Sequence, residues 1–181
     1  KFEAVSYHTP YQDEAVTISF HPAGHVLGSA QIRLEYNKEV IVVTGDYKTI
    51  PDPSCAAFEI VPCDIFVTEA TFGLPVFKHP APQTQINKLF YSLKINPQRP
   101  HLIGAYALGK AQRLIALLRD AGYNKTIYLH GAMVDLCHLY KQEGIDLGVL
   151  EKVDARGNEK IERYKGDIII APPSALQSSW A

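Results

Sequence analysis

Three β-strand patterns in the first half of the chain each end near a residue that can bind a metal ion. Strand patterns cover residues 15–20 and 30–36 as apolar–polar alternation, and residues 39–44 and 64–68 as apolar runs typical of buried strands. His25 follows the first pattern, Asp46 the third and Glu69 the fourth, and Asn37 with Lys38 predicts a hairpin turn. Because α/β folds build their sites at the carboxyl ends of strands, we expect the three side chains to share one edge of a sheet.

The second half of the chain changes to alternating helix and strand patterns. A proline cluster formed by Pro75, Pro80 and Pro82 precedes this change. Helices are predicted at residues 83–93, 108–121 and 132–142, and strands at 101–105, 126–130 and 167–171. This alternation implies a parallel sheet with helices on its faces. We therefore predict two domains, residues 1–82 and residues 83–181.

Metal-dependent phosphate chemistry is the hypothesis that best accounts for these strand ends. His25 lies in a loop with Gly24 and Gly28, and a neutral imidazole is a good zinc ligand. Asp46 comes 21 positions later. A shared carboxylate can hold two cations about 3.5 to 4 Å apart, which polarise a phosphoryl oxygen and supply hydroxide. A lone histidine or Gly-Asp pair is more often structural, so the recurrence at three strand ends carries the prediction.

The motifs themselves resemble a known family. The stretches AGHVLGSAQ, VVTGDY and TEATFG resemble three successive motifs of the metallo-β-lactamase-fold nucleases that carry a β-CASP domain. EATFGLPVF, AYALGKAQR, LHGA and APPSA resemble the ligase-associated DNA exonucleases more than the RNA-processing members. The resemblance covers nearly the whole chain and implies an α/β fold: part of a metallo-β-lactamase αββα sandwich (residues 1–82), then part of a Rossmann-like β-CASP domain (residues 83–181).

This resemblance implies roles for the three strand-end residues. His25 and Asp46 would be metal ligands, Asp46 would be the catalytic carboxylate that bridges both ions, and Glu69 would be a catalytic acidic residue that orients a neighbouring ligand. The cofactors implied are two divalent metal ions, zinc or manganese. The activity implied is that of a DNA exonuclease in DNA repair, with DNA as substrate and an ATP-dependent DNA ligase and a helicase as partners.

The chain also departs from the family pattern. The family's His-x-His-x-Asp-His cluster is absent, since no two of the 7 histidines stand two positions apart, and no β-CASP histidine motif follows Trp180. The chain begins at Lys1 and its only methionine is Met133, so we expect an internal fragment. Because a zinc site needs about three or four ligands, we expect the fragment alone to bind metal weakly and to be inactive. His21 is assigned no ligand role.

Three residues of the second half are candidates for nucleic-acid contacts. Lys110 and Arg113 lie in the first turns of a helix entered through Gly109, where free backbone N–H groups and the helix dipole favour a phosphate. Tyr106 precedes this helix and could stack on a base. The alternatives are a solvated helix face for the two cations and core packing for Tyr106.

Composition limits the other classes of function. The net charge is -1, so a nucleic acid must be held by a local basic patch or by metal ions. No apolar run approaches the roughly 20 residues of a membrane span. The 3 cysteines show no CxxC spacing, which favours a reducing cytoplasm over a disulfide framework. Two alternatives remain open: an RNA 3′-end processing nuclease of the same fold, and a non-catalytic segment that binds nucleic acid or acts as a scaffold.

Overall fold

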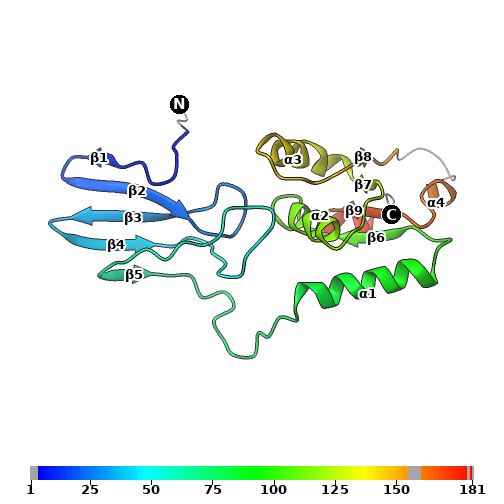
Figure 1. Ribbon diagram of the computed structural model, residues 1–181, viewed down its shortest axis with the longest axis horizontal. Coiled ribbons are helices and arrows are strands. Elements are labelled where there is room, and N and C mark those ends of the chain that lie inside the picture. The colour runs from blue at the N-terminus through cyan, green and yellow to red at the C-terminus, as the bar shows by residue number, and fades with distance from the viewer. Residues whose placement is uncertain (1–3, 155–159, 179, 181) are drawn as a thin grey trace. The chain divides into compact units, whose positions relative to one another are not determined.

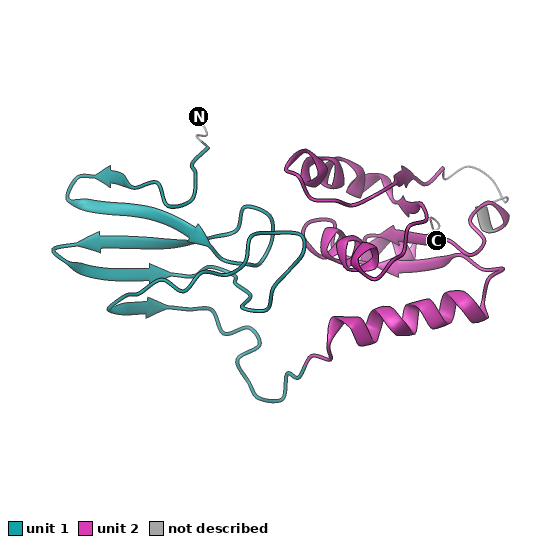
Figure 2. Ribbon diagram, viewed as in Figure 1, with its two compact units in different colours: residues 1–78 teal, residues 79–181 magenta. Residues whose placement is uncertain are grey.

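The computed structural model describes residues 4–154, 160–178 and 180 and divides the chain into two compact units. Unit 1 comprises residues 1–78 and unit 2 residues 79–181 (Figure 2). The division falls in the proline-rich stretch, close to the boundary predicted after residue 82. Each unit has its own sheet, so each is described by itself.

Unit 1 is a five-stranded sheet with the strand order β1-β2-β3-β4-β5 (Figure 1). Its strands are β1 (Tyr11–Asp13), β2 (Val16–Pro22), β3 (Ala30–Tyr36), β4 (Glu39–Val43) and β5 (Ile65–Val67). Neighbours from β1 to β4 are antiparallel, whereas β5 pairs with β4 in parallel. Consequently β2, β4 and β5 run in the same direction, and their carboxyl ends lie at the same edge of the sheet.

The hairpin between β3 and β4 confirms the predicted turn. Tyr36 pairs with Glu39, and the two residues between them, Asn37 and Lys38, have φ values of 48° and 69°. Positive φ at both central residues is the type I′ geometry that matches the twist of the flanking strands. This turn fixes the register of β4 and therefore the position at which Asp46 leaves the sheet.

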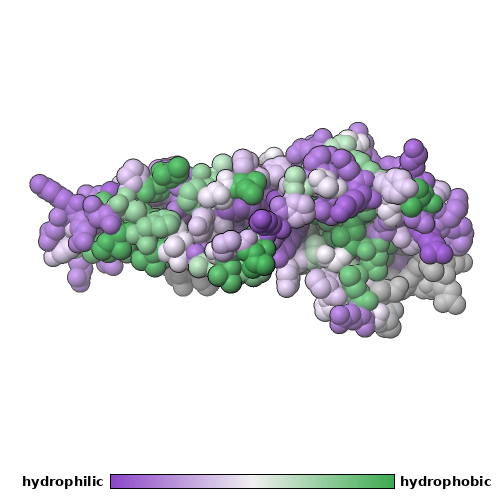
Figure 3. Space-filling view, turned by 90° about the horizontal axis from the view of Figure 1, so that it is seen from below, coloured by the Kyte–Doolittle hydropathy of each residue, from purple (hydrophilic) through white to green (hydrophobic). Residues whose placement is uncertain are grey.

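The prediction that residues 64–68 form a buried strand is wrong as to burial. Strand β5 forms, but Ile65, Phe66 and Val67 are 43%, 49% and 49% exposed. The strand lies at the edge of the sheet and pairs only with β4. Hydrophobic side chains accordingly gather on the surface of this unit (Figure 3). An apolar run in the sequence indicates that a segment tends to be buried. It does not indicate which other element covers that segment.

Unit 2 is an α/β unit with a fully parallel sheet in the order β6-β9-β7-β8, which confirms the predicted alternation. Its elements are α1 (Pro82–Ile95), β6 (His101–Gly104), α2 (Lys110–Asp120), β7 (Ile127–Leu129), α3 (Gly131–Gln142), β8 (Leu150–Lys152), α4 (Lys160–Arg163), β9 (Ile168–Ala171) and the 3-10 helix η1 (Pro173–Gln177). The sequence patterns did not predict β1, β8 or α4, each of which has only three or four residues.

The core of unit 2 is formed by its sheet together with α2 and α3, whose Met133 and Tyr140 are fully buried. All four residues of β9 are buried, and Ile115 and Leu118 of α2 are fully buried. A fully buried leucine or isoleucine stabilises a fold by about 1.5 to 3 kcal/mol, so this unit has a substantial apolar core. Within the described ranges, no helix combines the length and the apolar composition that crossing a bilayer requires.

Candidate metal centre at three strand ends

His25 is presented by a tight loop after β2. The hydroxyl oxygen of Ser29 accepts hydrogen bonds from the backbone N–H groups of His25 (3.0 Å) and Val26 (3.1 Å). Gly24 has a φ of 70°, and a Cβ there would overlap the carbonyl oxygen of Lys48 and lie 2.9 Å from the nitrogen of Phe58. The loop therefore needs glycine at this position, and the close packing fixes the direction in which His25 leaves the sheet.

Asp46 leaves the same edge of the sheet after β4. Thr44 is fully buried, and its N–H donates to the carbonyl oxygen of Val67 over 3.0 Å, which joins the ends of β4 and β5. The Asp46 Oδ2 atom lies 3.8 Å from the Nε2 atom of His25. This separation is too long for a hydrogen bond. It is close to the spacing of about 3 to 3.5 Å between two donors on one zinc ion with bonds of about 2 Å.

Glu69 leaves the same edge of the sheet after β5. One of its carboxylate oxygens, Oε2, accepts a hydrogen bond of 2.7 Å from the backbone N–H of Thr71. Hydrogen bonds from Thr71 hold the pKa of the Glu69 carboxyl below its ordinary value, and the charge of His25 and the backbone N–H of Tyr47 act in the same direction. Glu69 is thus an anionic carboxylate in the electrostatic neighbourhood of His25. The structure brings His25, Asp46 and Glu69 to one edge of unit 1, while their metal-binding and catalytic roles stay predictions.

The chemistry of these donors fits divalent zinc or manganese. One imidazole nitrogen and one carboxylate are ligand types that both ions accept, and the side chains of His25 and Asp46 are reachable from solvent. Zinc takes about four ligands, three of them from the protein in a catalytic site, so His25 and Asp46 alone are too few for two ions. The two residues fit one part of a two-metal centre.

The candidate nucleic-acid residues lie on unit 2. Tyr106 is 62% exposed, so the alternative of core packing is wrong, and the Lys110 ammonium lies 4.6 Å from the centroid of its ring. The expectation of free N–H groups is wrong for two groups of the first turn of α2. The N–H of Lys110 donates to Leu108 and that of Ala111 donates to Tyr106. Contacts of Lys110, Arg113 and Tyr106 with nucleic acid remain a prediction.

Sequence reasoning missed a second group of potential ligands in unit 1. Donor atoms of His8, His21 and Glu59 all lie within 4.8 Å of one another. His21 is in β2, but 51 positions separate His8 from Glu59, so no local pattern records their contact. Only the pairing of strands and loops brings these side chains together.

Comparisons with known proteins point to one family. No established family profile matches the chain. The chain is 27% identical over 166 residues to a probable DNA ligase of Opitutus terrae, which covers 90% of the chain and 16% of that protein. It is 31% identical over 123 residues to endoribonuclease YSH1 of Gibberella zeae, which covers 66% of the chain and 15% of that protein. The chain therefore spans only about a sixth of the length of these two curated relatives.

A solved structure shares the fold. The crystal structure of a protein of unknown function from Enterococcus faecalis V583 matches with a TM-score of 0.58 at 12% sequence identity, over 94% of this chain and 44% of that one. The relatives, the shared fold and the ordered His, Asp and Glu motifs agree with one another. The chain resembles the β-CASP branch of the metallo-β-lactamase-fold nucleases, and it has the α/β fold that this resemblance implies.

Proposed function

We propose that the whole protein hydrolyses phosphodiester bonds with two divalent metal ions and acts as a DNA exonuclease in DNA repair. The observation that carries the proposal is the convergence of an imidazole and two carboxylates at the carboxyl ends of β2, β4 and β5, with His25 and Asp46 3.8 Å apart. When bound, the ions would polarise a phosphate oxygen and supply a hydroxide nucleophile.

The residues of this chain have separate tasks in the proposal. His25 offers Nε2 to a metal ion, and its loop holds the imidazole through the backbone hydrogen bonds to Ser29. Asp46 is 73% exposed and offers a carboxylate that can bind both ions. Glu69 is fixed by Thr71 and orients a neighbouring ligand rather than the substrate. Zinc is the first choice of ion because imidazole binds it well, and manganese is the second.

We propose Lys110, Arg113 and Tyr106 as contacts to the nucleic-acid strand. The Lys110 ammonium lies over the exposed Tyr106 ring, so a cation and an aromatic face are presented together. A phosphate can bind the cation while a base stacks on the ring, as in proteins that hold single strands.

DNA is the first candidate substrate and RNA the second. The similarity to a protein named probable DNA ligase favours DNA and an association with a DNA ligase. The proposals that this ligase depends on ATP and that a helicase is a further partner rest on the family resemblance alone. The similarity to a protein named endoribonuclease favours RNA processing and internal cleavage. A third candidate is a non-catalytic segment that binds nucleic acid or acts as a scaffold, because His25 and Asp46 alone are too few ligands for two ions.

The test compares the whole protein with two aspartate variants on end-labelled single strands of DNA and RNA of the same sequence. Asp46→Ala is expected to lower the rate at least about 100-fold, because it removes the carboxylate that bridges the ions. Asp13→Ala, an exposed aspartate of β1, is the matched control and is expected to leave the rate unchanged. Full activity of Asp46→Ala contradicts the proposal.

The products separate the three candidates. Stepwise shortening of DNA from one end supports the DNA exonuclease. Faster or internal cleavage of RNA supports the RNA-processing nuclease. Retention of DNA without cleavage of either strand by the whole protein supports the scaffold.

A further inference from the structure

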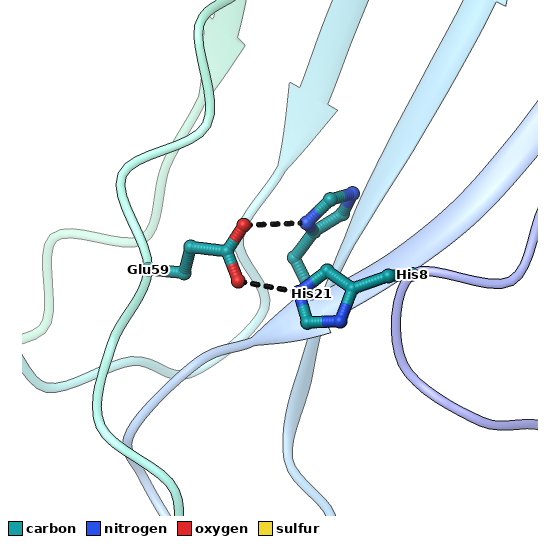
Figure 4. Close-up of side chains that lie close together, drawn as sticks. All are labelled: His8, His21 and Glu59. Carbon is teal, nitrogen blue, oxygen red and sulfur yellow. Dashed lines mark hydrogen bonds and ion pairs between the residues drawn. The ribbon is translucent and has the colours of Figure 1, made fainter.

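His8, His21 and Glu59 form a compact group of donor atoms on unit 1. The Nε2 atom of His8 lies 2.6 Å from Oε2 of Glu59, and the Nδ1 atom of His21 lies 3.0 Å from Oε1 of the same carboxylate (Figure 4). The two imidazole rings meet edge to face with their centroids 5.0 Å apart. Two nitrogens and one carboxylate therefore point at a common volume.

The backbone around this group is held in place. His8 adopts a φ of 63°, a left-handed conformation uncommon for a side-chain-bearing residue, and its N–H donates to the carbonyl oxygen of Phe20 over 2.9 Å. Gln31 is buried, and its amide nitrogen donates to the carbonyl oxygens of both Pro22 and Glu59. The segments that carry the three side chains are thus joined through the end of β2.

The protonation states suit a metal ligand set. Hydrogen bonding by His8 holds the pKa of the Glu59 carboxyl below its ordinary value, with His21 adding to the effect. An ionised carboxylate only accepts hydrogen bonds, so without metal the facing nitrogens of His8 and His21 carry the protons. When a metal ion binds, each of these protons moves to the other ring nitrogen, Nδ1 of His8 and Nε2 of His21. His21 then carries its proton on Nε2, which lies 3.1 Å from the hydroxyl of the buried Ser19.

Ser19 gives the group the outer partner that metal-binding histidines normally have. A ligating imidazole usually donates its second N–H to an oxygen, which fixes the ring and its tautomer. The Ser19 hydroxyl occupies this position for His21. His8 is 56% exposed and Glu59 38% exposed at the side chain, so an ion can reach the group from solvent.

We propose that His8, His21 and Glu59 bind a zinc ion in a site that shares no ligand with His25, Asp46 and Glu69. Two imidazoles and one carboxylate favour zinc over magnesium or calcium, which prefer oxygen ligands alone. Three protein ligands leave one tetrahedral position for water. The ion would tie the segment before β1 to β2 and to the segment between β4 and β5, and so stabilise the sheet that presents the strand-end residues.

The test is a zinc titration of the chain carrying Asp46→Ala, which removes a ligand of the proposed catalytic centre. This background is expected to bind one zinc ion per chain, seen by calorimetry and by the absorption of cobalt as a substitute ion. His8→Ala and Glu59→Gln are expected to weaken binding more than about 100-fold, because each leaves only two ligands. Ser19→Ala keeps all three and is expected to weaken binding about 10-fold through loss of the outer partner.

A matched control and a fold measurement keep the outcome decisive. His138→Ala, an exposed histidine of α3, is expected to leave zinc affinity unchanged. Zinc is expected to raise the melting temperature of the background chain and of His138→Ala but not of His8→Ala, and circular dichroism confirms that each variant folds. Equal affinity for zinc in His8→Ala, Glu59→Gln and His138→Ala overturns the site. Because Asp46 is absent throughout, this result leaves the proposed nuclease function untouched.

Discussion

The Nε2 atom of His25 lies 3.8 Å from the Oδ2 atom of Asp46, although the two residues belong to loops that follow different strands. Two features produce this proximity. The parallel directions of β2 and β4 bring both loops to one edge, and the buried Thr44 fixes the end of β4 against β5. The sheet and its loops therefore determine how far apart His25 and Asp46 lie. Substitutions that disturb these loops without changing either side chain should change metal binding.

Ser29→Ala is the first such substitution. It removes the acceptor of two backbone hydrogen bonds, from His25 and Val26, and each is worth about 1 kcal/mol. We expect the metal concentration for half-maximal activity of the whole protein to rise by up to about 30-fold, since the two bonds together are worth about 2 kcal/mol and about 1.4 kcal/mol is a factor of ten in affinity. The measurement is activity against manganese or zinc concentration. Ser178→Ala, which loses a hydroxyl contact in unit 2, is the control, and an unchanged metal dependence for Ser29→Ala would contradict the positioning role.

Local sequence patterns predicted the strand ends because the type of each residue, apolar or polar, reflects whether its side chain is buried. The β-branched run in β4 and the alternation in β3 reflect which side chains face the interior, and Asn37 with Lys38 reflects the backbone conformation of the turn. Those patterns sufficed to place His25 and Asp46 at strand ends. The directions of the strands then bring these residues together, because they determine which strand ends lie at the same edge of the sheet.

Contacts between distant segments could not be predicted in this way. The hydrogen bond between His8 and Glu59 joins residues 51 positions apart, and neither residue lies in a periodic pattern. The exposure of Phe66 in β5 depends on what covers an edge strand, which its own sequence does not encode. A strand of three residues such as β1 is too short to show alternation. In each case the missing information lies in tertiary structure.

Gly24→Ala is expected to destabilise unit 1 strongly. Its φ of 70° is unfavourable for alanine, and the added Cβ would lie 2.9 Å from the nitrogen of Phe58 and closer still to the carbonyl oxygen of Lys48. Backbone atoms cannot move aside as a flexible side chain can, so we expect a loss of about 3 kcal/mol or more in the free energy of unfolding. Gly28→Ala is the matched control. Its φ is 76°, but nothing lies within 4 Å of the added Cβ, so the loss should be only about 1 to 2 kcal/mol.

Urea unfolding of both variants measures the difference. The unfolding transition of unit 1 should have its midpoint at a lower urea concentration in Gly24→Ala than in Gly28→Ala. Equal midpoints would mean that the loop moves away from Lys48. The close packing against the backbone of Lys48 and Phe58 would then not be the reason why position 24 requires glycine.

Arg119→Lys is expected to destabilise unit 2. The guanidinium donates to four backbone carbonyl oxygens, those of Leu147 (3.0 Å), Tyr123 (2.5 Å), Lys125 (2.7 Å) and Val149 (2.8 Å). Lysine has a single nitrogen and cannot span this set, so we expect a loss of about 2 to 4 kcal/mol in the free energy of unfolding. Arg163→Lys is the control, since its ion pair with Asp154 is exposed and contributes at most about 1 kcal/mol. If Arg119→Lys lowers the free energy of unfolding no more than the control does, the hydrogen bonds of Arg119 do not stabilise unit 2 as proposed.

The buried carboxylate of Asp52 should make the stability of unit 1 depend on pH. Burial alone would raise the pKa of the Asp52 carboxyl, but hydrogen bonds from Lys48 and Ser54 outweigh burial and hold the pKa below its ordinary value. A depressed folded-state pKa means that ionised Asp52 stabilises the fold fully above its unfolded pKa of about 3.9. The contribution is lost as the pH falls through the lower folded-state pKa.

Asp52→Asn separates this contribution from other acid effects. At neutral pH the free energy of unfolding of the variant should be lower by about 2 to 4 kcal/mol. The Asp52 side chain is only 2% exposed, and the Lys48 ammonium loses its charged partner when Asp52 is replaced. The difference between the two proteins should shrink below about pH 4, because Asp52 of the unfolded chain then takes up a proton before Asp52 of the folded chain does. Urea midpoints measured across this range check the prediction, with exposed Asp13→Asn as control. A difference that stays constant down to strongly acidic pH would show that the loss comes from packing, since only the charge on Asp52 titrates.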